Sequence, residues 1–127
     1  MAVKYKLVDR KNPLDHSQPA KKYAIAVREK KVTPNQMAKV IQDKSSLTRG
    51  DIMNTMLSYS DEMKKELLNG NAIEVAGIGI FSLSLSSDGV ATESDFNART
   101  HIKGARVRFT PSKELKDAIS TIEYKKL

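Results

Sequence analysis

Two adjacent segments with the signals for starting and ending a helix constrain the fold most. Thr33-Pro34-Asn35-Gln36 forms a capping box with proline at the first helical position, and Thr48-Arg49-Gly50-Asp51 repeats the capping pattern after a polar break at residues 44–46. Gly70 suits the left-handed position that ends a helix. Apolar residues recur at helical spacing between these signals, which predicts a helical hairpin: Met37, Val40, Ile41, Ile52, Met53, Met56, Leu57, Met63, Leu67 and Leu68.

Two strand patterns precede the predicted hairpin. Residues 4–8 and 22–28 alternate polar and apolar side chains, as half-buried strands do, and a loop with Pro and Ser separates them. We therefore expect residues 1–32 to form an N-terminal β extension packed on residues 33–127, within a single domain overall.

Three more strand patterns follow the hairpin, at residues 72–75, 80–85 and 105–109, with a Gly-Ile-Gly turn between the first two. Residues 86–100 are polar and are expected to form a loop or a frayed hairpin. A short helix opens next, and residues 122–124 have the pattern of a final strand. This order predicts an α+β protein: a helical hairpin, a three-stranded antiparallel sheet and a short C-terminal helix, with extra N-terminal β-strands.

The strand at residues 105–109 has two different faces. Val107 and Phe109 alternate with Arg106 and Arg108, so the apolar pair is expected in the core and the arginines on the opposite face. The free amides near Ser112 are a possible phosphate site. Six cations are candidates for phosphate contact, against the alternative of an ordinary solvated surface: Arg99, Lys103, Arg106, Arg108, Lys113 and Lys116.

The net charge of +7 is unevenly distributed along the chain. Residues 1–32 contain nine Lys and Arg against three Asp and Glu. Residues 33–98 contain five against nine, and residues 99–127 eight against three. Basic ends that flank an acidic middle predict one positive face, as in proteins that bind nucleic acid.

The composition argues against several classes of function. The chain has no Cys, which excludes disulfides, thiolate metal sites and thiol catalysis. Neither His16 nor His101 has further ligands at metal-like spacing, and no segment resembles a signal peptide or a membrane span. We expect a soluble cytoplasmic protein that is not an enzyme, has no cofactor or metal and takes no small-molecule substrate.

Two motifs resemble the HU and integration host factor family of bacterial histone-like proteins. Gly77-Ile78-Gly79-Ile80-Phe81 resembles the Gly-Phe-Gly-Thr-Phe turn of that family, and residues 109–116, Phe-Thr-Pro-Ser-Lys-Glu-Leu-Lys, resemble its Phe-x-Pro-x-Lys-x-Leu-Lys run. The whole chain is most similar to HU-like proteins of Bacteroides-type bacteria, which carry an N-terminal extension. The resemblance implies an HU-like fold, a homodimer of interlocked helical hairpins, and binding of duplex DNA in the nucleoid.

One segment departs from the family pattern. The family's arm ends in Arg-x-Pro-x-Thr-Gly, whose proline wedges between base pairs, whereas residues 86–97 contain no Pro, Lys or Arg and three acids. Kinking of DNA by a proline wedge is therefore not carried over. Phe96 is either an apolar wedge in its place or, as we expect, a loop aromatic that is packed or partly exposed.

The function expected from these observations is non-enzymatic binding of duplex DNA through phosphate contacts, with little sequence specificity. The acidic arm leaves open an alternative, an HU-like fold that serves as a protein-interaction or assembly module. RNA binding is less expected, because the chain has no Trp and only three Phe for base stacking.

Overall fold

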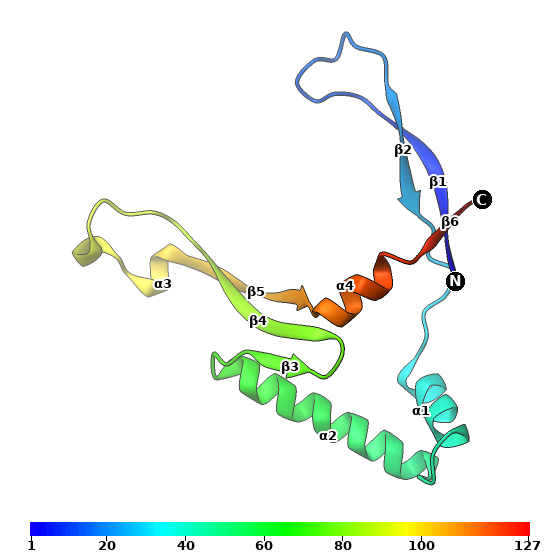
Figure 1. Cartoon of the computed structure of the whole chain (residues 1–127). Coiled ribbons are helices and arrows are strands. Elements are labelled where there is room, and N and C mark those ends of the chain that lie inside the picture. The colour runs from blue at the N-terminus through cyan, green and yellow to red at the C-terminus, as the bar shows by residue number, and fades with distance from the viewer. The chain divides into compact units, whose positions relative to one another are not determined.

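The computed structural model describes all 127 residues and divides the chain into two compact units (Figure 1). One unit is Pro34–Asp117, and the other joins Met1–Thr33 to Ala118–Leu127. The predicted α+β class and the order of helices and strands are confirmed. No helix combines the length and the apolar character that a membrane span requires.

The unit Pro34–Asp117 begins with the predicted helical hairpin. Helix α1 is Pro34–Asp43 and helix α2 is Arg49–Leu68. The hydroxyl of Thr48 accepts the amide of Asp51 at 3.1 Å and so caps α2 as predicted. The side-chain oxygen of Asn35 accepts Arg49 Nε at 2.9 Å, which ties the start of α1 to the start of α2.

The end of α2 is closed by backbone hydrogen bonds around a left-handed glycine. Gly70 has φ of +84° and its amide donates to Leu67 O at 3.0 Å. The amide of Asn71 donates to Glu66 O at 3.0 Å, which completes a Schellman motif. The predicted role of Gly70 is confirmed, and the chain turns here into the sheet.

The sheet of this unit has three antiparallel strands in the order β3-β4-β5. Strand β3 is Ile73–Val75, β4 is Gly79–Ser87 and β5 is Ile102–Pro111. Strands β4 and β5 extend well beyond β3 as a two-stranded ribbon, drawn in green and yellow-orange in Figure 1. Both strands of the ribbon are longer than the sequence predicts, because the pairing of β4 with β5 continues to Ser87 and Ile102.

The register of β4 and β5 separates the two faces of the ribbon. Phe81 lies across from Phe109 with ring centroids 4.8 Å apart, and Leu83 lies across from Val107. Alternation places the intervening residues on the opposite face, where the cross-strand pairs are Ser82 with Arg108 and Ser84 with Arg106.

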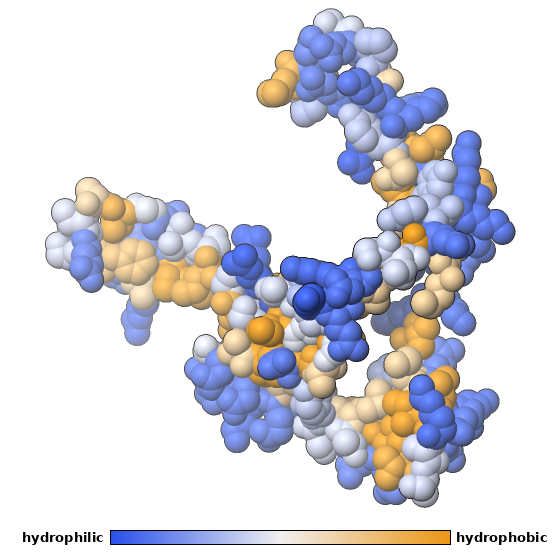
Figure 2. Space-filling model, viewed as in Figure 1, coloured by the Kyte–Doolittle hydropathy of each residue, from blue (hydrophilic) through white to orange (hydrophobic).

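The expected burial of Val107 and Phe109 is wrong for the isolated chain. Val107 is 58% exposed and Phe109 41% exposed. Only two hydrophobic residues are buried in the whole chain, Ala38 and Ile52, both on the helical hairpin. Figure 2 shows hydrophobic residues along the ribbon and over the helices. The apolar face is correctly identified by its pattern, but this chain alone contributes too little structure to cover it.

The tip of the ribbon is more ordered than the predicted loop. A short 3-10 turn, η1 (Glu93–Asp95), and a single helical turn, α3 (Ala98–His101), lie between the strands. The His101 carbonyl accepts the amide of Asp88 at 2.8 Å, and the His101 ring nitrogen Nδ1 accepts that of Asn97 at 2.8 Å. These bonds close the tip on itself.

The second unit is a small sheet in the order β2-β1-β6. Strand β1 (Ala2–Arg10) pairs antiparallel with β2 (Lys21–Ala26) and parallel with β6 (Glu123–Lys126). Helix α4 (Lys113–Ile119) leads from the first unit into β6. The C-terminal strand thus completes the N-terminal sheet. The boundary between residues 32 and 33, and the packing of residues 1–32 on the rest of the chain, stay a prediction.

Gly79 is the position where this fold depends most on the absence of a side chain. Its φ is +155°, and an added Cβ would lie 2.2 Å from the Thr110 carbonyl oxygen. We expect Gly79→Ala to lower the free energy of unfolding by about 3 kcal/mol or more, because a strained backbone and a steric conflict each cost about 1–3 kcal/mol. Urea denaturation followed by circular dichroism measures the change.

The control for this substitution is Gly89→Ala, because no atom lies within 4 Å of a Cβ added at Gly89. It should change the free energy of unfolding by less than about 1 kcal/mol. Equal stability of the two variants would contradict the close approach of β4 and β5 at Gly79.

Candidate nucleic-acid interface

The polar face of the β4–β5 ribbon, made of Ser82, Ser84, Arg106 and Arg108, is the best candidate for contact with a polyanion. The two arginines are two residues apart on β5, so both project from this face. Each lies across from a half-buried serine of β4. The face therefore combines two cationic forks with two small hydroxyl donors, which is a set suited to phosphate oxygens.

Neither arginine of the polar face is neutralised by an acid. The cations in the four ion pairs of the structure are others: Lys4, Lys22, Lys64 and Lys103. Both arginines are exposed. An exposed cation without a partner keeps its full charge for an approaching phosphate, whereas a paired one must first give up its carboxylate.

Lys103 is placed differently from the two arginines. A register shift at Ser86 and Ser87 leaves it without a residue directly across the ribbon. Its ammonium lies 3.1 Å from a carboxylate oxygen of Asp88 and donates to Thr100 O at 2.9 Å. The structure therefore uses Lys103 to hold the base of the tip, and its charge is partly offset.

Arg99, Lys113 and Lys116 lie on other elements. Arg99 is exposed on the single turn α3, where its amide donates to Asn97 Oδ1 at 3.0 Å. Lys113 and Lys116 are exposed on α4. The Ser112 hydroxyl accepts the amide of Leu115 at 3.1 Å. Because the chain itself fills this cap, the start of α4 is a weaker phosphate site than the sequence indicates.

The ring of Phe96 packs locally at the tip of the ribbon. Its centroid is 5.3 Å from that of the His101 ring, and Phe96 is 41% exposed. Thr92 donates to the carboxylate of Asp95 at 2.8 Å beside it. Phe96 is thus a partly exposed aromatic that contacts His101 within the tip, as expected.

Sequence patterns alone gave no prominence to the two serines of the polar face. Their signal is the Ser-x-Ser alternation of β4, which becomes meaningful only when the register sets each serine beside an arginine. The arrangement can neutralise and hydrogen-bond phosphates. The structure brings no three His, Asp or Glu side chains together as metal ligands.

Comparisons with known proteins agree with this geometry. The model of the family described as HU domain fused to wHTH, Ig, or glycine-rich motif matches residues 1–126. The DNA-binding protein HRL53 of Rhizobium leguminosarum is 30% identical over 87 residues, which cover 68% of this chain and 96% of that protein. The DNA-binding protein HRm of Rhizobium meliloti (strain 1021) is 29% identical over 87 residues, with coverage of 68% and 97%.

A crystal structure from Bacteroides vulgatus ATCC 8482, of a protein provisionally classed as DNA binding, has a similar fold. Its TM-score is 0.68 at 18% identity, and the match covers 99% of this chain and 48% of that one. The fold is thus of the HU-like type that the two motifs predict. With its match over residues 1–126, the chain belongs to the family of HU domains fused to a wHTH, Ig or glycine-rich motif.

Proposed function

We propose that this chain is a non-enzymatic, histone-like protein that binds duplex DNA through phosphate contacts. The observation that carries the proposal is the polar face of the ribbon, where Arg106 and Arg108 stand exposed and unpaired. The DNA-binding proteins HRL53 and HRm support it, because the match with this chain covers 96% and 97% of their lengths. We propose that the protein acts in the nucleoid, where the duplex DNA of a bacterial cell lies.

Little discrimination between DNA sequences is expected from this face. Specific readers commonly place Asn or Gln against adenine and several Arg against guanine in the major groove. Neither β4 nor β5 contains an Asn or a Gln. The serines are too short to reach deep into a groove, and two arginines by themselves discriminate only guanine, so we expect most contacts to be with the sugar-phosphate backbone.

We further propose that the DNA-binding form is a homodimer. The isolated chain leaves apolar residues exposed on the ribbon and on both long helices, among them Leu57, Met37 and Val40. A core of two buried hydrophobic residues is too small to hold a domain of this size. Obligate homodimers bury large apolar interfaces, so a second copy is the partner that accounts for so much exposed surface.

The acidic tip is only weak support for the alternative function, a protein-interaction module. One of its acids, Asp88, is paired with Lys103, and Asp95 is held by Thr92. These carboxylates therefore serve the tip itself. DNA binding remains the function that the exposed arginines support best.

The arginines are tested by the double substitution Arg106→Ala with Arg108→Ala. We expect roughly tenfold weaker binding to a random-sequence duplex at moderate salt, and a log–log salt slope smaller by about two, because each neutralised phosphate contributes about 0.9 to that slope. Fluorescence anisotropy titrations at several salt concentrations measure both quantities.

The matched control removes two cations from the same unit, with Lys64→Ala and Lys65→Ala on α2. It should leave the salt slope within about half a unit of wild type. Glu93→Gln, which removes an acid from the tip, should leave binding unchanged or strengthen it. An Arg106/Arg108 variant that is folded and binds as tightly as wild type would refute the role of the polar face.

The dimer is tested by light scattering, which should give twice the chain mass of 14.1 kDa. Val107→Glu should shift the protein toward monomer, because Val107 is 58% exposed in the single chain and a charge there is tolerated only without a covering partner. Leu14→Glu is the control, since Leu14 is 93% exposed in the loop of the other unit. A wild-type monomer at micromolar concentration would contradict the proposal.

A further inference from the structure

The two units of the chain differ sharply in charge. Residues 1–33 and 118–127 contain eleven Lys and Arg against four Asp and Glu, a net charge of +7. The unit of residues 34–117 contains eleven of each and is neutral. The whole net charge therefore belongs to the unit outside the helical hairpin and ribbon. An electrostatic footprint of this kind marks a surface for polyanions.

The register of the N-terminal sheet places the unpaired cations of β1 and β2 on one face. Arg10 lies directly across from Lys21, and Lys6 is on the same face by alternation along β1. None of these three forms an ion pair, and all are exposed. We call Lys6, Arg10 and Lys21, together with Tyr23 across from Val8, the basic face.

The opposite face of the same sheet is of a different character. Val3, Tyr5 and Leu7 line an apolar groove there, and Lys22 is paired with Asp9 at 3.2 Å. Near the basic face, Glu29 is engaged by Lys4, whose hydrogen bond and charge lower the pKa of the Glu29 carboxyl. The acids of β1 and of the segment after β2 thus already have partners, and the basic face keeps its charge.

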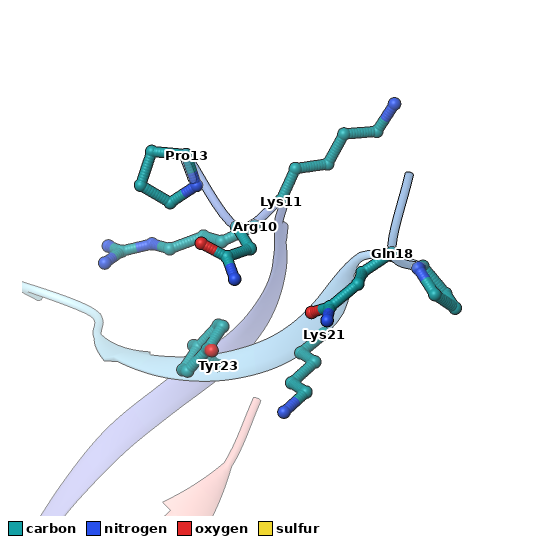
Figure 3. Close-up of a pocket in the computed structure, with 8 residues that line it drawn as sticks. Arg10, Lys11, Pro13, Gln18, Lys21 and Tyr23 are labelled. Atoms are coloured by element: carbon teal, nitrogen blue, oxygen red, sulfur yellow. The ribbon is translucent and has the colours of Figure 1, made fainter. Parts of the chain in front are cut away.

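The end of the β1–β2 hairpin forms a pocket of about 440 Å³ on the basic face (Figure 3). Arg10, Lys11, Lys21 and Tyr23 line it, and none of its lining residues is acidic. The Arg10 guanidinium carbon lies 6.0 Å from the centroid of the Tyr23 ring. This contact steadies the guanidinium without neutralising it, so the charge is held in place for an anion.

The spacing of these cations fits a polymer better than a single small anion. Figure 3 shows the side chains of Lys11 and Lys21 pointing away from one another. The three cations of the pocket, Arg10, Lys11 and Lys21, therefore diverge and do not converge on one point as a site for free phosphate would need. A row of separated cations along strand β1 matches a line of successive phosphates.

We propose that the basic face of the N-terminal sheet is a second DNA-binding surface, with the hairpin pocket holding the sugar-phosphate backbone. The inference rests on the proposed function for the identity of the polyanion, and it assigns to the extension a share of the affinity separate from that of the ribbon. An anionic membrane is the less favoured partner, because Leu14 is an isolated exposed apolar residue beside the pocket.

The full-length variant Arg10→Gln with Lys21→Gln tests this surface. Binding to a random-sequence duplex should weaken roughly tenfold, and the log–log salt slope should fall by about two, as for two lost phosphate contacts. Lys22→Gln with Lys126→Gln is the matched control, since it removes the same charge from the opposite face of the same sheet. This control should bind within about twofold of wild type, because both lysines lie on the face opposite the proposed surface.

A second measurement does not depend on any variant. Acetylation of lysines in the wild-type protein, followed by mass spectrometry, should show Lys11 and Lys21 protected when duplex DNA is added and Lys22 unprotected. Protection of Lys22 alone, or of none of the three, would overturn the inference.

The outcomes separate the inference from the proposed function. If wild type fails to bind duplex DNA at all, both fail. If Arg106→Ala with Arg108→Ala weakens binding while Arg10→Gln with Lys21→Gln equals its control, only the second surface is refuted. Vesicles with phosphatidylglycerol provide the last test: loss of vesicle binding in the Arg10/Lys21 variant, with its DNA affinity unchanged, would also overturn the inference.

Discussion

The antiparallel register of β4 and β5 is the constraint on which the rest of the unit depends. Pairing Phe81 with Phe109 sets every other pair along the ribbon, because side chains alternate with a period of two. A slip by one residue would turn Arg106 and Arg108 to the apolar face. Gly79 secures this register, since only a residue without Cβ allows the close approach to Thr110 at the start of β4.

The same register makes folding and function inseparable in this protein. One face of the ribbon holds exposed cations, which we propose contact DNA, and the other holds exposed apolar residues. A ribbon has only two faces, so a protein surface that covers the apolar residues has to pack against the apolar face alone. The proposed dimer would associate through that side and leave the polar face free, so it is compatible with the proposed DNA contact on the other side.

The net charge lies in a different unit from the exposed apolar face of the ribbon. The unit with the helical hairpin and ribbon is neutral, so the DNA contact proposed for it is local and depends on where Arg106 and Arg108 stand. The N-terminal unit carries the net charge, whose field extends over about one Debye length of 8–10 Å in physiological salt. In the proposed arrangement both units contact DNA, and only the N-terminal unit adds a net charge that attracts DNA from a distance.

The sequence by itself determined what depends on neighbouring residues. Thr48 and Gly70 mark the ends of α2 because capping is local chemistry, and the alternation around Arg106 identifies both faces of β5. Tertiary structure decided what depends on distant residues: the pairing of Lys103 with Asp88, the parallel addition of β6 to β1, and the exposure of Val107. None of these leaves a local pattern, because each arises from strand pairing across a long separation or from how little of the apolar surface one chain covers.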